Sequence, residues 1–254
     1  MDLGLAGRRA LITGASRGIG FACALALAAE GCDVALVGRD VHLLKAAVKA
    51  IRARFRVGVS SHATDLSVPA RQAALIEVVG DIDILVNNAG AIPPGELDVV
   101  SDASWRAAWE LKVFGYINLA RLVLPRMEAQ GHGVIVNVIG AAALRPRPDY
   151  IVGATGNSAL VGFTRALGSR SLEHRVRVVG VNPGLIMTER LEVLLRRAAA
   201  ERWGNPERWD ELIPLDPPPG RADQVADVVA FLASDRAGYV SGTVVTVDGG
   251  ASAF

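Results

Sequence analysis

The fold is decided by one stretch near the N-terminus, Thr13-Gly14-Ala15-Ser16-Arg17-Gly18-Ile19-Gly20. The apolar run at 10–12 before it is typical of a buried strand, and the alanine-rich pattern at 19–30 after it is typical of a helix. Glycine allows close backbone approach to a pyrophosphate, and the free N–H groups of a helix start attract the anion. The strand–turn–helix context therefore favours a dinucleotide site over a plain tight turn. The predicted contacts within the turn are Gly14, Ser16, Arg17, Gly18, Ile19 and Gly20.

Short apolar runs recur along the chain, with helical patterns between them. The runs lie at 33–37, 84–87, 134–139, 176–181 and 244–247, with a weaker one at 57–63, and the helical patterns lie at 41–53, 105–127 and 154–170. The runs are too continuous for half-exposed strands, so they indicate strands buried on both faces. We expect an α/β fold, a doubly wound (Rossmann-type) parallel sheet of about seven strands with helices on both faces. A chain of 254 residues can bury one core, so residues 1–254 are predicted to form one domain.

The segment 190–219 interrupts this alternation. It contains a charged helical pattern at 191–203 and ends in Pro217-Pro218-Pro219-Gly220. A long excursion at the carboxyl side of the strands is often a substrate lid, here with Trp203 and Trp209 as apolar walls. A helix pair that packs in an oligomer explains the segment equally well.

Composition and charge narrow the possible partners. The 27 basic and 26 acidic residues nearly cancel and form no long run, which argues against nucleic acid or an anionic membrane as a partner. Cys23 and Cys32 lack the spacing of a disulfide framework or a metal site, so we expect small buried residues and no metal. No apolar run is long enough for a signal or transmembrane segment, and we expect a cytoplasmic protein.

The end of the second predicted strand bears on the choice of dinucleotide. A carboxylate there would bind the adenosine ribose 2′-hydroxyl and repel a 2′-phosphate, but this chain has Arg39 instead. Arg17 in the turn offers a second guanidinium, and planar donors suit phosphate. We expect NADP(H) to be preferred and NAD(H) to be possible, although Asp40 beside Arg39 is able to weaken the preference.

Further motifs follow the glycine-rich turn in a fixed order: Asn87-Asn88-Ala89-Gly90, Asn182-Pro183-Gly184 with Thr188, and Val247-Asp248-Gly249-Gly250. Together they resemble the short-chain dehydrogenase/reductase family over essentially the whole chain. The resemblance implies that Asp65 and Leu66 border the adenine, that Asn88, Ala89 and Gly90 support a ribose, and that Pro183, Gly184, Ile186 and Thr188 hold the nicotinamide amide and phosphates. It also implies a homodimer or homotetramer built through the two long helices at 105–127 and 154–170.

The catalytic positions of that family are occupied differently here. The family uses a Ser, a Tyr four residues before a Lys, and an Asn on the preceding long helix. The corresponding residues of this chain are Gly140, Gly153, Asn157 and Lys112, respectively. The three glycines 140, 153 and 156 also remove bulk from the pocket floor, which would admit a large substrate or leave a pocket that only binds.

Lys112 and Tyr150 are the candidate catalytic residues. Lys112 is placed to polarise a carbonyl or to hold an anionic substrate near Asn157, or else it is an ordinary surface lysine. Tyr150 is expected to line the pocket or to pack against the lid, in preference to donating a proton. Asp149 is expected to cap the following helix or to form the turn before it. Thr155 and Ser158 are expected to be helix-packing residues.

Three functions agree with these patterns. The first is an NADP(H)-dependent oxidoreductase that acts on a carbonyl or alcohol through a non-standard proton donor. The second is a redox-silent NADP(H)-binding sensor or partner protein, and the third is a cofactor-independent lyase or isomerase that uses Lys112 or Asp149. The substrate is expected to be a small molecule. The apolar residues Leu191, Leu194, Leu195, Trp203 and Trp209 suggest either a hydrophobic substrate or a buried interface.

Overall fold

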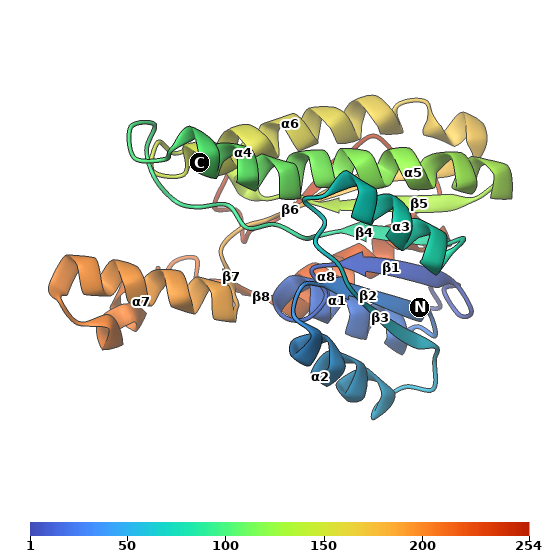
Figure 1. The fold of residues 1–254 in the computed structure, drawn as a ribbon, viewed down its shortest axis with the longest axis horizontal. Helices are drawn as coiled ribbons and strands as arrows, with labels where there is room; N and C mark the ends of the chain where they lie inside the picture. The colour runs from blue at the N-terminus through green and yellow to red at the C-terminus, as the bar shows by residue number, and fades with distance from the viewer. Residues whose placement is uncertain (254) are drawn as a thin grey trace.

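The computed structural model describes residues 1–253, and its centre is a parallel sheet of seven strands in the order β3-β2-β1-β4-β5-β6-β9 (Figure 1). The strands are β1 (Arg9–Thr13), β2 (Asp33–Gly38), β3 (Val59–Ala63), β4 (Ile84–Asn87), β5 (Gly133–Val138), β6 (Val176–Pro183) and β9 (Val244–Val247). The order reverses direction between β1 and β4, which makes the sheet doubly wound. The predicted fold class is therefore confirmed.

Helices cover both faces of the sheet. The bounds are α1 (Gly18–Ala29), α2 (Val41–Arg52), α3 (Pro69–Val79), α4 (Asp102–Trp109), α5 (Gly115–Gln130), α6 (Ile151–Gly168) and α8 (Ala222–Ala233). Figure 1 shows α3, α4, α5 and α6 above the sheet and α1, α2 and α8 below it. The helices α3 and α8 were not among the helical patterns identified in the sequence.

The continuous apolar runs are explained by alternation within each strand. Leu11 packs with α3 and α5, whereas its neighbour Ile12 packs with α1 and α8, and both are fully buried. Successive strand side chains point to opposite faces, so a strand covered on both sides needs apolar residues at every position.

The predicted long helix at 105–127 is divided into three parts. Between α4 and α5 the backbone widens into a π-helical turn, η1 (Glu110–Phe114), which contains Lys112. Such insertions are often found at functional sites. A pattern with the ordinary helical period cannot reveal an extra residue in one turn, so the sequence predicted a single regular helix.

The segment 190–219 forms an arm that projects from the sheet (Figure 1). The arm contains α7 (Glu189–Trp203) and η4 (Pro206–Leu212), and the short strands β7 (Ile186–Met187) and β8 (Gly220–Arg221) pair at its base. The prediction that Trp203 and Trp209 form pocket walls is wrong. The Trp203 ring lies against Arg202 and Arg208, and the Trp209 ring lies against Arg196, because these large rings fasten η4 onto α7.

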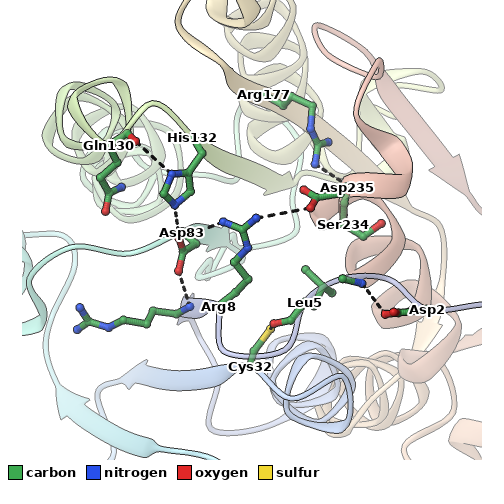
Figure 2. A network of polar contacts seen from close by, with 12 residues as sticks. Asp2, Leu5, Arg8, Cys32, Asp83, Gln130, His132, Arg177, Ser234 and Asp235 are labelled. Carbon is green, nitrogen blue, oxygen red and sulfur yellow. Dashed lines mark hydrogen bonds and ion pairs between the residues drawn. The ribbon is translucent and has the colours of Figure 1, made fainter.

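A polar network connects the amino ends of the strands to the C-terminal helices (Figure 2). The Asp83 carboxylate accepts hydrogen bonds from the Arg9 backbone N–H at 2.7 Å and from His132 Nε2 at 2.6 Å. Arg8 lies between Asp83 and Asp235, at 3.5 Å from each carboxylate. The network therefore links β1, the start of β5 and the segment after α8.

Both cysteines are buried and free. Burial raises the pKa of each thiol to about 12, so both stay protonated. Within residues 1–253, no group of three His, Cys, Asp or Glu side chains is arranged to hold a metal ion. In the same part of the chain, no helix combines the length and apolarity needed to cross a membrane.

Candidate functional site

A cleft of about 1440 Å³ opens at the carboxyl ends of the strands. It brings together most of the residues predicted to hold a dinucleotide, although they are far apart in the sequence. Those that line it are Gly14, Ser16, Arg17, Gly18, Ile19, Arg39, Leu66, Asn88, Ala89, Gly90, Pro183, Gly184, Ile186 and Thr188. Gly20 and Asp65 do not line it. Ligands of doubly wound sheets bind at this edge, where the strand order reverses.

The glycine-rich turn has the geometry of an anion cradle. Gly14 and Gly18 have φ values of 64° and 60°, which side chains rarely allow. Among residues 1–253, no side chain caps the N-terminus of α1, so its first N–H groups face the cleft without a side-chain acceptor. A Cβ on Gly20 would collide with the Gly14 carbonyl, so glycine at this position lets the start of α1 pack closely against the turn. These features fit a bound pyrophosphate.

Asn88 fixes the turn from the neighbouring strand. Its side-chain amide donates to the Thr13 carbonyl at 2.9 Å, and its backbone N–H donates to the Thr13 hydroxyl at 2.8 Å. The Ala89 N–H donates to the same hydroxyl at 3.0 Å. Thr13 and Asn88 therefore lock the ends of β1 and β4 together, which gives Asn88 a clear structural task beside its place in the cleft lining.

Two guanidinium groups, those of Arg17 and Arg39, line the cleft where the sequence predicts an adenosine phosphate. Arg17 lies 3.4 Å from Glu189 in an exposed ion pair, whereas Arg39 makes no ion pair with a carboxylate of the described chain. The Asp40 carboxylate is engaged as the N-cap of α2, where it accepts from the N–H groups of His42 and Leu43. Asp40 is thus held by its own helix, which limits its ability to weaken the preference for a phosphate.

Asp65 closes a turn next to this end of the cleft. Its carboxylate accepts from the Ser67 hydroxyl at 2.7 Å and from the Ser67 N–H at 3.0 Å. These hydrogen bonds, assisted by the charge of Arg39, lower the pKa of Asp65. Asp65 does not line the cleft, whereas its neighbour Leu66 does.

The space left by Gly153 is filled by Tyr150. A Cβ built on Gly153 would overlap the Tyr150 ring at Cε1 and Cζ, so the aromatic ring lies where a side chain of residue 153 would begin. Tyr150 lines the cleft, as expected. Burial raises the pKa of its phenol, while the nearby charge of Arg190 opposes that shift. The phenol is therefore protonated at neutral pH.

Gly140 is required by its backbone. Its φ of 145° lies in a region that side chains rarely adopt, and a Cβ there would be 2.7 Å from Asn157 Nδ2. Gly156 faces Val113 and Trp109 and lies outside the cleft lining. Neighbouring side chains therefore occupy the space beside Gly153 and Gly156, whereas Gly140 itself lines the cleft.

Lys112 is buried at the cleft floor, so the alternative of a surface lysine is wrong. It is 9% exposed, and its Nζ donates to the Ile139 carbonyl at 2.6 Å. Burial, with a smaller contribution from the positive charge of Arg190, lowers the pKa of Lys112 to about 7. Tyr116, one turn later, is directed to the same strand end and donates to the Val138 carbonyl. Lys112 is thus able to change charge near neutral pH.

Asn157 completes the floor beside Gly140. It is 2% exposed, and its Oδ1 has no hydrogen-bond donor among residues 1–253. Buried amide oxygens are nearly always satisfied, so this atom is suited to a donor on a ligand or water.

Arg190 is a residue that the sequence reading missed. It donates to the Gly90 carbonyl at 2.6 Å and to the Ile92 carbonyl at 2.9 Å, which fastens the start of α7 across the cleft. The only sequence signal is its position two residues after Thr188, which is too common a pattern to single it out. From the arm, Leu191 and Leu194 also line the cleft, but Leu195 does not.

Asp149 does not cap α6, contrary to one of its two predicted tasks. The N-cap position is held by Tyr150, and the Asp149 carboxylate forms an ion pair with Arg147. A neighbouring guanidinium is a stronger partner than an exposed N–H. Thr155 and Ser158 donate to carbonyls of the preceding helical turn, as expected of packing residues.

Comparison with known proteins decides the family. A family model described as enoyl-(acyl carrier protein) reductase matches residues 14–252. The chain belongs to the short-chain dehydrogenase/reductase family. The match begins at the glycine-rich turn and includes the cleft, the arm and the last strand.

Relatives within the short-chain dehydrogenase/reductase family are similar over nearly their full lengths. The 2,3-dihydro-2,3-dihydroxybenzoate dehydrogenase of Bacillus subtilis is 34% identical over 98% of this chain and 97% of the relative. The L-xylulose reductase of Mus musculus is 32% identical over 98% of each chain. The crystal structure of L-sorbose reductase from Gluconobacter frateurii, complexed with NADPH and L-sorbose, is 33% identical with a TM-score of 0.90 and covers 98% of both chains. These similarities indicate an NAD(P)-dependent oxidoreductase.

Proposed function

We propose that the protein is an NADP(H)-dependent oxidoreductase that interconverts a carbonyl compound and an alcohol through a non-standard active site. The observation that carries the proposal is that one cleft joins the glycine-rich anion cradle to the phenol of Tyr150 and the ammonium of Lys112. A cofactor bound there supplies or accepts the hydride. The residues of the chain must then orient the substrate and exchange the proton.

NADP(H) is favoured over NAD(H) by the charges at the adenosine end. Arg39 and Arg17 both line the cleft and are our proposed partners of a 2′-phosphate, and no carboxylate follows β2 directly. The related L-sorbose reductase is described with NADPH bound. We assign the contacts to the residues of the turn and to 88–90 and 183–188 that line the cleft, with Gly20 and Asp65 as structural supports.

Tyr150 is the proposed proton donor. The family places its tyrosine at the position of Gly153, and here the ring of Tyr150 enters that space from one turn earlier. Its raised pKa keeps the proton on the phenol, as reduction of a carbonyl requires. Lys112 is the proposed source of positive charge in the site, because Asn157 replaces the lysine that the family uses.

Substitution of Tyr150 by Phe tests the proposal. We expect Tyr150→Phe to lower kcat about 10²–10⁴-fold, because a positioned general acid is worth that factor, and to leave NADPH affinity unchanged. The assay is oxidation of NADPH at 340 nm with a panel of ketones, aldehydes and sugars, beside a calorimetric titration of NADPH. Tyr239→Phe is the matched control, because Tyr239 is 97% exposed.

Three outcomes separate the candidate functions. Hydride transfer that survives Tyr150→Phe unchanged would show that another group donates the proton. Tight NADPH binding by the wild type without turnover on any compound would favour the redox-silent sensor, which agrees with the glycines at the family's Ser and Tyr positions. Turnover without cofactor that is lost in Lys112→Ala would favour the lyase or isomerase.

We further propose that the chain acts as one domain, in the cytoplasm, as a homodimer or homotetramer. The single seven-stranded sheet supports one domain, and the balanced charge supports a small molecule, not a polymer, as the partner. For the arm 190–219 we favour the substrate-covering task over oligomer packing, because Leu191 and Leu194 line the cleft.

A further inference from the structure

We propose that the substrate carries an anionic group, a carboxylate or a phosphate, which binds between Lys112 and Arg190 at the inner end of the cleft. The inference rests on the proposed function and specifies its substrate class. It follows from how the cations of the cleft are partnered.

Lys112 and Arg190 are held only by neutral groups. Lys112 donates to the Ile139 carbonyl, and Arg190 donates to the carbonyls of Gly90 and Ile92. Neither forms an ion pair with a carboxylate among residues 1–253. Both contribute to the lining of the cleft, where a ligand can reach them.

The other arginines of α7 show that this arrangement is not general on the arm. Arg196 lies 2.9 Å from Glu192 and 2.8 Å from Glu207, and Arg197 lies 2.8 Å from Glu201. Arg197 also lines the cleft but is paired with Glu201, and Arg202 lies over the Trp203 ring, whereas Arg190 has only backbone carbonyls as partners. Arg190 is itself exposed, so the cost of a missing anionic partner falls mainly on Lys112, which is buried.

The acidic residues that line the cleft are already engaged. Glu189 pairs with Arg17, and the Asp248 carboxylate accepts from the N–H groups of Gly250 and Ser252. A buried ammonium without an anion is expensive, and the positive charge of Arg190 adds to that cost. A ligand anion would offset both the cost of burying the Lys112 ammonium and its repulsion by Arg190.

The groups around Lys112 suit this assignment. Arg190 faces it from α7, Tyr150 contributes a neutral phenol near Arg190, and Asn157 contributes a neutral amide from α6. An anion held by the two cations would lie beside the phenol that we propose as the proton donor. The reacting carbonyl would then be close to the anionic group in the substrate.

Calorimetry on the NADP⁺-saturated protein tests the inference without turnover. The probes are levulinate against its neutral methyl ester, and dihydroxyacetone phosphate against dihydroxyacetone. Saturation with NADP⁺ removes the phosphate positions of the cofactor from the competition. For the wild type we expect at least one anion to bind about tenfold or more tightly than its neutral counterpart, as for a charge-assisted contact.

Variants locate the contact. Arg190→Met and Lys112→Met should each bring the ratio of acid to neutral affinity toward about one, whereas Arg197→Met should leave it unchanged, because Glu201 already neutralises Arg197. Thermal unfolding and NADP⁺ affinity of each variant confirm that the cleft is intact. A preference for the carboxylate or for the phosphate supports the inference and identifies the group.

Proton uptake gives an independent readout. An anion raises the pKa of Lys112, so binding at pH 8 should take up part of a proton, seen as a dependence of the binding enthalpy on the buffer. The methyl ester should give no uptake. Equal affinity for the charged and neutral probes, a preference that survives both substitutions, or no binding of either anion overturns the inference. Failure to bind NADP⁺ would instead count against the proposed function.

Discussion

At the scale of single residues, the ring of Tyr150 occupies the space where a side chain of Gly153 would begin. A glycine on one helical turn leaves a volume that an aromatic ring from the turn before can enter. The two residues are coupled, since a side chain restored at 153 collides with the ring of Tyr150. Substitutions at either position therefore need to be read together.

Lys112 provides a residue-scale prediction about stability. Its pKa of about 7 lies far below the ordinary value of 10.5, so the unfolded chain holds the proton more tightly than the folded one. The burial cost is fully present below pH 7 and declines as the pH rises from 7 toward 10.5, at about 1.4 kcal/mol per pH unit.

We expect the free energy of unfolding of Lys112→Met, relative to the wild type, to fall by roughly 2–3 kcal/mol between pH 6 and pH 9. Urea unfolding of both proteins at both pH values measures this difference in the free energy of unfolding. The other titrating groups are the same in both proteins, so their contributions cancel. A difference that stays constant with pH would contradict the buried, titrating lysine.

At the scale of elements, the part of the cleft predicted to bind the cofactor is formed where the carboxyl ends of several strands lie together. The turn after β1 is held by Asn88 from the end of β4, and the residue after β2 supplies a guanidinium. Each element contributes only one or two groups, and their convergence is set by the parallel sheet. The choice of dinucleotide is therefore concentrated in the short connection after β2.

Arg39→Asp tests that choice. The substitution replaces a phosphate partner by a carboxylate that accepts from a ribose 2′-hydroxyl and repels a 2′-phosphate. We expect the ratio of NADPH to NADH affinity to fall by about 10²-fold or more, the sum of a lost charge-assisted contact and a new repulsion. Arg56→Asp, outside the cleft, is the control, and a ratio unchanged in Arg39→Asp would remove the support for NADP(H).

At the scale of the whole molecule, the two ends of the sheet have different tasks. The carboxyl ends carry the cleft, and the amino ends carry the network of Arg8, Asp83, His132 and Asp235 that joins distant parts of the chain (Figure 2). Burial opposes ionisation of Asp83 most strongly, but hydrogen bonds from Arg9 and His132 and the charge of Arg8 outweigh it and lower its pKa.

Asp83→Asn should lower the free energy of unfolding at pH 7 by about 1–3 kcal/mol, because the amide satisfies fewer of these donors. Because the folded pKa lies below the ordinary value of 3.8, the stabilisation is present above that pH and is lost as the pH falls through the folded pKa. The gap between variant and wild type should therefore close in acid. Asp81→Asn is the control, because Asp81 is exposed and 4.0 Å from its partner Arg126; equal losses in the two variants would contradict the network.

The sequence by itself determined the sheet, the glycine-rich turn and the family. Strands with apolar residues at every position indicate burial on both faces of the sheet. Glycines between a strand and a helix indicate a turn whose backbone a ligand can approach closely. Both signals are local, so one chain segment is enough to read them. The same holds for Arg17 and Arg39, whose places follow directly from the strand ends.

The surroundings of Tyr150, Lys112 and Arg190 were decided only by the tertiary structure. That Tyr150 fills the space of Gly153, that Lys112 is buried on a π-helical turn, and that Arg190 crosses the cleft all depend on contacts between separate elements. Whether a side chain is buried, and whether its charge has a partner, depends on neighbouring elements that come together only when the chain folds. A lysine in a sequence has no dielectric environment until the fold supplies one.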